Sequence, residues 1–339
     1  MILITGGTGF VGQEVVKQFV DAGHSVRVLA RDVEKAQSIL GSKQVEVVQG
    51  DILETTTLKK AFQDVRAVVH LVGIIAEIRD SSFEKIHVQG TRNVVTAAKK
   101  ASVSRFLHVS AIGTREYAAS NYHKSKWQAE ELIRKSSLPW TIFRPSLIYG
   151  KHDSFSNLFA SLLDFPFNIA AKGTMPCLGD GTNLFQPVAV EEVASSILNA
   201  LASEKAHLKT YDVVGPSLEF QEMLCQIAKA KGKKPVFLDC APIAQPFIGL
   251  LNLMAGNYPI VIPVAMPLCR IGVFIYQALG LSFLHQKLLE LEFPLPKLIP
   301  SEDQLTMLEE SQFGDSQPLQ EDLGITTRPF AEGIKAYLF

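Results

Sequence analysis

Three residues in the first half of the chain have the types and the spacing of a proton-transfer site. Ser110 follows residues 105–109, which are predicted to form a β-strand, and Tyr122 comes twelve residues later. Lys126 stands four residues beyond Tyr122, in a segment whose later residues have helical spacing. Because positions i and i+4 of a helix are neighbours, we expect the tyrosine and the lysine on one helix face.

These three side chains would serve proton transfer during a hydride-transfer reaction. An ammonium beside a phenol favours the phenolate, so Lys126 would lower the pKa of Tyr122 and Tyr122 would act as acid or base. Ser110 would hydrogen-bond the carbonyl or hydroxyl of a substrate. The alternative is a tyrosine that only packs in the core. A serine at the end of the preceding strand favours the catalytic interpretation.

The opening of the chain predicts a dinucleotide site. Residues 2–5 (ILIT) are β-prone and run directly into glycines, and a helical pattern follows. The order strand, glycine turn, helix suits a diphosphate because glycines allow a sharp turn and close approach, and the helix N-terminus faces the negative charge. A glycine-rich turn without a ligand is the alternative. The expected contacts are Gly6, Thr8, Gly9, Phe10, Val11 and Gly12.

The end of the predicted second strand bears on the choice of cofactor. Residues 24–30 alternate as a strand does, and Arg31 and Asp32 follow them. An arginine at this place accommodates a ribose 2′-phosphate, whereas an acidic residue holds a 2′-hydroxyl. The arginine comes first, so NADP(H) is favoured, and Asp32 keeps NAD(H) open. A solvated loop role for Arg31 is the remaining alternative.

Further strand ends supply the other expected cofactor contacts. Residues 45–48 lead to Asp51 and Ile52. The Asp51 carboxylate would accept a hydrogen bond from an adenine amino group, or would cap a helix that begins near Glu54. Residues 67–72 form a continuous apolar run, typical of a parallel strand buried on both faces, in which His70 is expected to be a core residue. Later contacts on the same sheet edge are expected from Val72, Gly73, Tyr122, Lys126 and Pro145.

The amino-acid composition and the net charge indicate a folded chain with no general attraction to nucleic acid. The 339 residues are 47% hydrophobic and carry a net charge of −1. Four cysteines lack any CxxC spacing, which indicates free thiols and no metal site. Because the first strand begins at Ile2, we expect no leader peptide in the sequence as written, so that the chain is cytosolic or already processed. The predicted location is cytoplasmic, with the periphery of the inner membrane as the other option.

Together these motifs resemble the short-chain dehydrogenase/reductase superfamily in its extended or atypical branch. Within that branch the chain is similar to the NAD(P)H-binding accessory subunit of respiratory complex I and its bacterial relatives. Proteins of that kind hold a nucleotide tightly and are not known chiefly for turnover. The segments that carry the resemblance are TGGTGFVG, Ser110, YHKSK, VQGTRNV, Arg144-Pro145-Ser146, FLHVSAIG, FQPVAVEEVASSILNAL, YDVVGP and LGITTRPFAEGI.

Two departures narrow what the resemblance implies. The extended branch usually has an asparagine where this chain has His87, so the usual buried water and proton relay are not expected here. The interval from Ser110 to Tyr122 is shorter than in sugar-nucleotide epimerases of the branch. A short interval leaves little loop for a nucleotide sugar, which argues against epimerase or dehydratase chemistry.

The sequence predicts a doubly wound parallel α/β sheet of the Rossmann type with a smaller C-terminal lobe. The Rossmann domain spans 1–150, a substrate or docking lobe spans 151–300 with 185–215 returning to the sheet, and a tail with short helices spans 301–339. Within the lobe, residues 241–286 contain Arg270 as their one charged residue, and their apolar runs are too short to span a bilayer. That segment is extra core, an interfacial membrane anchor or a surface for a membrane complex.

Two functions remain open. In the first, the chain is an oxidoreductase that moves hydride between NADP(H) and a small apolar, carbonyl or quinone substrate. In the second, it is a non-catalytic NADPH-holding accessory or assembly protein of the complex I kind, in which the bound nucleotide stabilises the fold. The Ser110, Tyr122 and Lys126 set favours the first, and the resemblance favours the second.

Overall fold

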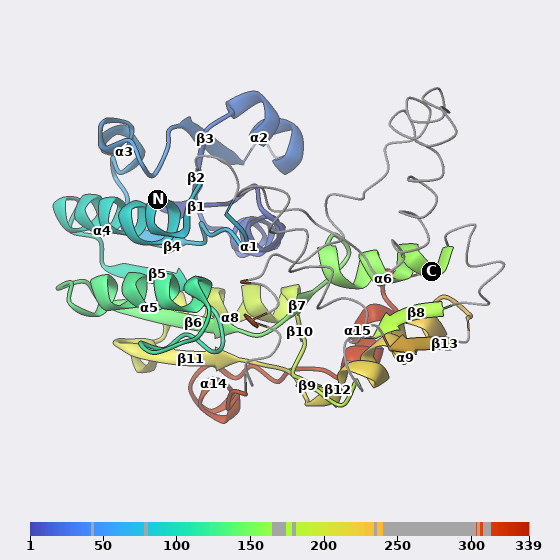
Figure 1. Ribbon diagram of the computed structural model, residues 1–339. Coiled ribbons are helices and arrows are strands. Elements are labelled where there is room, and N and C mark those ends of the chain that lie inside the picture. The colour runs from blue at the N-terminus through green and yellow to red at the C-terminus, as the bar shows by residue number, and fades with distance from the viewer. Residues whose placement is uncertain are drawn as a thin grey trace, which may run out of the picture.

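A computed structural model describes residues 1–41, 44–77, 81–164, 174–177, 181–233, 236–239, 303, 306–307 and 313–338. Its centre is a parallel sheet of seven strands in the order β11-β6-β5-β4-β1-β2-β3 (Figure 1). The five inner strands are largely buried on both faces, as strands inside a parallel sheet must be, whereas the edge strands β3 and β11 are only partly buried. Their bounds are β1 Ile2–Thr5, β2 Val26–Ala30, β3 Val45–Gln49, β4 Ala67–His70, β5 Arg105–Val109, β6 Trp140–Pro145 and β11 Lys209–Val213.

Helices cover both faces of this sheet and bury a separate core on each. One core joins α1, α8 and α14 to side chains such as Ile4 and Phe143, and the other joins α3, α4 and α5 to the alternate strand residues such as Phe106 and Ile142. The predicted doubly wound Rossmann-type fold is confirmed. The bounds are α1 Phe10–Asp21, α2 Val33–Leu40, α3 Thr55–Ala61, α4 Gly90–Lys100, α5 Asn121–Arg134, α8 Val190–Ala202 and α14 Gln317–Leu323, with a π-helical segment, η1, at Glu84–Gln89 before α4 and a 3-10 segment, η2, at Glu204–Ala206.

The strand order places a switch point between β1 and β4. Strands β2 and β3 extend the sheet on one side of β1, and β4, β5 and β6 extend it on the other. At such a point the connections leave in opposite directions and open a crevice at the carboxyl ends of the strands. The glycine stretch after β1 and the residues after β4 and β5 all lie at this edge.

A smaller group of elements packs beside the carboxyl edge around its own core. Phe220, Met223 and Ile227 of α9 meet Tyr149 and Phe330 there. The elements are β7 Ile148–Tyr149, α6 Ser154–Asp164, β8 Thr174–Cys177, β9 Leu184–Phe185, β10 Val188–Ala189, β12 Leu218–Glu219, α9 Phe220–Ala230, β13 Val236–Asp239 and α15 Phe330–Ile334.

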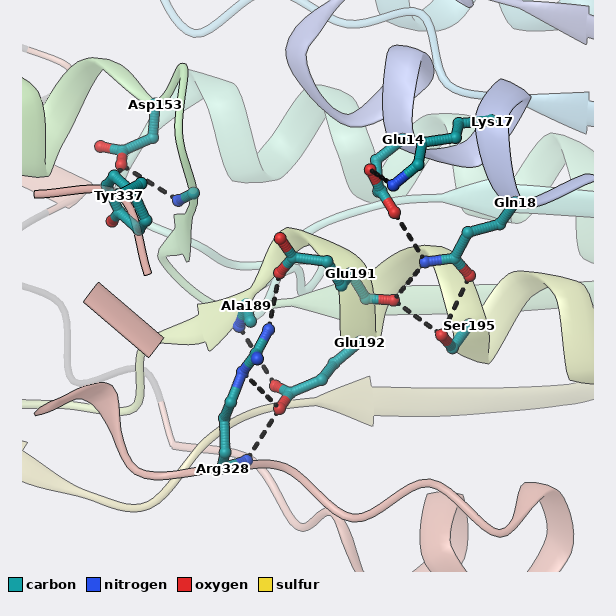
Figure 2. Close-up of polar contacts among 11 residues, drawn as sticks. Glu14, Lys17, Gln18, Asp153, Ala189, Glu191, Glu192, Ser195, Arg328 and Tyr337 are labelled. Carbon is teal, nitrogen blue, oxygen red and sulfur yellow. Dashed lines mark hydrogen bonds and ion pairs between the residues drawn. The ribbon is translucent and has the colours of Figure 1, made fainter. Parts of the chain in front are cut away.

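Residues 313–338 contact both groups of elements. Arg328 bonds the carboxylates of Glu191 and Glu192 at the start of α8, and Gln18 of α1 donates to the Glu191 carbonyl at 3.0 Å (Figure 2). The Tyr337 hydroxyl donates to the buried Asp153 carboxylate at 3.2 Å. This C-terminal stretch therefore ties the start of α8 to the smaller group.

The apolar segment 241–286 lies outside the described residues. Among the residues that are described, no helix combines the length and the apolar character needed to span a membrane.

Candidate functional site

The glycine loop after β1 is held by contacts that leave no room for side chains. Gly6 has φ +80°, and a Cβ on it would lie 3.1 Å from backbone atoms of Leu71 and Val72, in the loop after β4. A Cβ on Gly12 would lie 2.1 Å from the Gly6 carbonyl oxygen. The glycines thus bring the start of α1 against the ends of two neighbouring strands.

The N-terminus of α1 suits a diphosphate. Gly9 is the exposed N-cap and has no side chain, and the first bond within the helix runs from the Gln13 N–H to the Gly9 carbonyl at 2.9 Å. The N–H groups of Phe10, Val11 and Gly12 therefore have no partner within their helix. Thr8 lies in the turn and its carbonyl accepts from the Gln13 side chain at 3.1 Å. Uncapped donors behind an exposed glycine form an anion-binding cradle.

Arg31 and Asp32 lie at the carboxyl end of β2 but are not equivalent. The Asp32 carboxylate accepts the Lys35 N–H at 2.9 Å and caps α2. The Arg31 side chain is exposed next to it. Asp32 therefore has a structural role as a helix cap.

Asp51 and Ile52 lie at the end of β3 as expected, but Asp51 does not cap α3. Its carboxylate accepts the Leu53 N–H at 2.9 Å in a tight turn, and Glu54 is the N-cap of α3. Ile52 is buried against Gly90, where a Cβ would come within 2.3 Å of its Cδ1. Gly90 thus makes room for the residue that follows Asp51.

Gly73 brings the loop after β4 next to two nitrogen atoms. A Cβ on this exposed glycine would lie 3.4 Å from His87 Nε2 and 3.6 Å from Lys126 Nζ. Val72, the preceding residue, is half-buried against Gly6. The structure therefore joins the glycine loop, the β4 loop and the middle of α5 in one place.

Ser110 and Lys126 meet at the carboxyl end of β5. The Lys126 ammonium donates to the Val109 carbonyl at 2.9 Å, and Val109 directly precedes Ser110. Ser110 is buried, its N–H bonds the Phe143 carbonyl, and its hydroxyl lies 3.4 Å from the Thr114 hydroxyl. The predicted serine and lysine thus occupy the same sheet edge.

Tyr122 lies in the first turn of α5, one turn before Lys126. Its ring meets Phe83 and His87 edge-on, with centroid distances of 5.8 and 5.5 Å. Burial raises the pKa of Tyr122 to about 12. This direction is opposite to the lowering expected from Lys126, because in the chain alone desolvation of the phenolate dominates. The group is therefore a phenol, a proton donor, at neutral pH.

His87 occupies the asparagine position of the extended branch and makes its own hydrogen-bond chain. The Ile74 N–H donates to His87 Nε2 at 3.0 Å, so Nδ1 carries the proton and donates to Ser125 Oγ at 2.8 Å. Ser125 in turn donates to the Tyr122 carbonyl at 2.7 Å. Burial, with Lys126 nearby, lowers the pKa of His87 to about 2, so the ring is neutral. The chain links the loop after β4 to the backbone of Tyr122.

Burial also lowers the pKa of Lys126 to about 8, against an ordinary value of 10.5. At pH 7 the Lys126 side chain is therefore charged although it is buried, which lowers the stability of the folded protein. We expect Lys126→Met to raise the free energy of unfolding at pH 7 by about 1–3 kcal/mol. The folded state binds this proton less tightly than the unfolded chain, so wild-type stability rises between about pH 8 and 10.5 and the advantage of the variant shrinks there.

Urea unfolding at several pH values measures this difference. Lys124→Met is the matched control, since Lys124 is exposed on the same helix and its loss should change stability little at any pH. The expectation would be contradicted if Lys126→Met were less stable than wild type at pH 7. It would also be contradicted if the difference in unfolding free energy between the two proteins did not change with pH.

Two further residues lie at the end of β6 and later in the chain. Pro145 is buried at the end of that strand, and the Ile112 N–H donates to its carbonyl at 2.9 Å. Gln186 exchanges two hydrogen bonds with the backbone of Gly314, at 2.8 and 3.3 Å. Its amide is thereby engaged with the C-terminal stretch.

Sequence reasoning missed the buried carboxylate of Glu130. It lies on α5 one turn after Lys126, is fully buried, and pairs with Arg144 at 2.9 and 2.6 Å and with Arg134. Arg134 at i+4 was the available signal. His70, expected in the core, is fully buried between the hydroxyls of Thr5 and Thr91 at 2.7 and 3.0 Å.

The comparisons with known proteins identify the part of the chain that carries the glycine loop. Residues 6–156 match the family model described as NAD(P)H-binding. We call this part of the chain the NAD(P)H-binding domain, after the family model that it matches. It contains the glycine loop, Arg31, Ser110, Tyr122 and Lys126.

Relatives match the NAD(P)H-binding domain and continue beyond it. Subunit 9 of the NADH dehydrogenase [ubiquinone] 1 alpha subcomplex of Arabidopsis thaliana mitochondria is 28% identical over 77% of this chain, which spans 65% of that protein. A ceramide reductase of Caulobacter vibrioides is 28% identical over 69% of this chain and 72% of its own length. The chain thus spans less than two thirds of the complex I subunit.

A solved structure shows the same fold over nearly the whole length. The NADPH-dependent quinone oxidoreductase of Escherichia coli, complexed with NADPH, has a TM-score of 0.67 at 18% identity and covers 99% of both chains. The resemblance to the extended short-chain dehydrogenase/reductase superfamily and to complex I accessory subunits is confirmed. The NAD(P)H-binding domain therefore has an oxidoreductase-type fold.

Proposed function

We propose that this protein is an NADPH-dependent reductase of a carbonyl or quinone substrate, in which Ser110, Tyr122 and Lys126 form the site. The observation that carries the proposal is the buried Lys126 ammonium, which is held on the Val109 carbonyl beside Ser110 and one helical turn from Tyr122. Among the described residues no carboxylate forms an ion pair with Lys126, although Glu130 is near enough to favour its charge, and an unpaired buried ammonium is costly. A catalytic role accounts for its presence.

Each residue has a distinct part in the reduction. The bound dinucleotide would supply the hydride. The Ser110 hydroxyl donates a hydrogen bond to the substrate carbonyl oxygen, and the Tyr122 hydroxyl gives that oxygen its proton as the carbonyl carbon is reduced. Lys126 stabilises the phenolate that remains on Tyr122, and its N–H groups would hold a ribose hydroxyl of the bound nucleotide.

The supporting test is turnover. Purified protein with NADPH and a panel of quinones, ketones and aldehydes should oxidise the nucleotide, and the rate should depend on Tyr122. Tight NADPH binding with no oxidation by any panel member would overturn the proposal.

The same proposal assigns the preference for NADPH to Arg31. Its exposed guanidinium lies at the end of β2, where a 2′-phosphate would lie, while Asp32 is engaged with α2. We expect Arg31→Ala to weaken NADPH binding roughly 10- to 100-fold, since hydrogen bonds to charged groups contribute about 1.5–3 kcal/mol. NADH is the matched control ligand, and calorimetric titration measures both. An equal loss for NADH would refute the assignment.

A second function is favoured by the match to the mitochondrial complex I subunit. In it, the protein holds NADPH without turning it over, and the nucleotide stabilises the fold by mass action. The apolar residues 241–286 would then contact a membrane complex at the inner membrane. Membrane fractionation, together with mass spectrometry of the bound nucleotide, separates this function from the first.

A further inference from the structure

The first turn of α5 receives a carboxylate from the far end of the chain. Asp303 Oδ1 accepts the Asn121 N–H at 2.6 Å, and its Oδ2 accepts the Tyr122 N–H at 3.0 Å. The Asp303 side chain therefore spans two successive amides of the helix that carries Tyr122 and Lys126, although 181 residues separate it from Tyr122.

The third amide of the turn has a different acceptor. The hydroxyl of Ser120, the N-cap, accepts the His123 N–H at 3.2 Å. The N–H groups of the first three residues of α5, from Asn121 to His123, are thus all bonded to side chains. This is the reverse of α1, whose N-cap is a glycine, and it indicates that the turn around Tyr122 is built to be rigid rather than to receive an anion.

The two bonds act on the backbone from which the phenol projects. A carboxylate at a helix N-terminus is favourable because it meets the positive end of the helix dipole. Two hydrogen bonds to successive amides also restrain the orientation of the first turn of α5, since the two N–H groups point in different directions. On its carbonyl side, Tyr122 is held by Ser125 and through it by His87.

We propose that Asp303 is a positioning residue for Tyr122, which sets the direction of the phenol toward the carbonyl oxygen of the substrate. The inference rests on the proposed reductase function. It extends the site to a residue outside the NAD(P)H-binding domain of residues 6–156.

A comparison of kinetic constants, nucleotide binding and amide exchange tests the inference. We expect Asp303→Ala to lower kcat roughly tenfold, because a small misplacement of a catalytic group is costly. KM and the NADPH dissociation constant should stay within about twofold, since both Asp303 oxygens are engaged with the backbone of α5. Hydrogen exchange at the amides of Asn121 and Tyr122 should become faster. Asp303→Asn, whose amide oxygen still accepts one bond, should recover part of kcat.

Asp315→Ala is the matched control. Asp315 also accepts a backbone amide, that of Gln317 at 2.9 Å, at the start of α14. The Asp315→Ala substitution should lower the melting temperature about as much as Asp303→Ala does, and it should leave kcat unchanged.

The outcomes separate three conclusions. If Asp303→Ala exposes the two amides but keeps kcat, Asp303 is only a helix cap and the inference is wrong. If Asp303→Ala does not fold, Asp303→Asn decides, and wild-type kcat in that variant together with faster exchange of either amide overturns the inference. If Tyr122→Phe itself turns over normally, the proposed function fails and the inference fails with it.

Discussion

Replacing Tyr122 by phenylalanine is expected to lower kcat for carbonyl reduction by about 10²- to 10⁴-fold, the range typical of a lost general acid. The change removes one hydroxyl. The ring keeps its edge contacts with Phe83 and His87, so the fold and the placement of α5 should not change. Because the phenol is protonated at neutral pH, the loss concerns the step that gives a proton to the substrate oxygen.

Steady-state rates with the best substrate of the panel, and a separate titration with NADPH, measure this effect. Tyr117→Phe is the matched control, since Tyr117 is 85% exposed in the loop between Ser110 and Tyr122. It should keep the wild-type rate. A Tyr122→Phe protein that keeps at least half of the wild-type kcat would remove Tyr122 from the mechanism and leave the nucleotide-holding function.

The strands could be predicted from the sequence because each strand is determined by the types of its own residues. Ala67–His70 is apolar except for its histidine, and Arg105–Val109 is apolar at three of its five positions, a composition that burial on both faces of a parallel sheet favours. The same holds for α9, whose apolar face is at Phe220, Met223 and Ile227. Once the strands are known, the parallel order brings Gly6, Gly73 and Ser110 to one edge.

What could not be predicted depends on contacts between distant segments. No local pattern indicates that Asp303 bonds the amides of α5, because the partners are 181 residues apart. The π-helical segment around His87 was also unforeseen, since its residues have ordinary helical spacing. The pKa of Tyr122 is a third case, because the extent of desolvation follows from packing rather than from the neighbouring lysine in sequence.

The other large effect is expected from Gly12→Ala, which should weaken NADPH binding roughly 100-fold or more and lower stability by about 1–3 kcal/mol through overpacking. The new Cβ would lie 2.1 Å from the Gly6 carbonyl oxygen and 2.7 Å from the Gly7 Cα. Both are backbone atoms, so no side chain can move aside. The loop must shift, and the three uncapped amides of α1 shift with it.

Two other alanine substitutions show whether this loss comes from the cradle. On Gly9 the Cβ would meet one atom, the Gly6 oxygen at 3.3 Å, so Gly9→Ala should fold normally and weaken binding only because its methyl group enters the space of the diphosphate. On Gly23, with φ +80° and open space around it, alanine should cost about 1 kcal/mol of stability and leave binding intact. Calorimetric titration with NADPH and thermal unfolding of all three variants give the answer. If Gly9→Ala binds NADPH as tightly as wild type, the diphosphate does not lie at this helix start, because a diphosphate bound there would collide with the new methyl group.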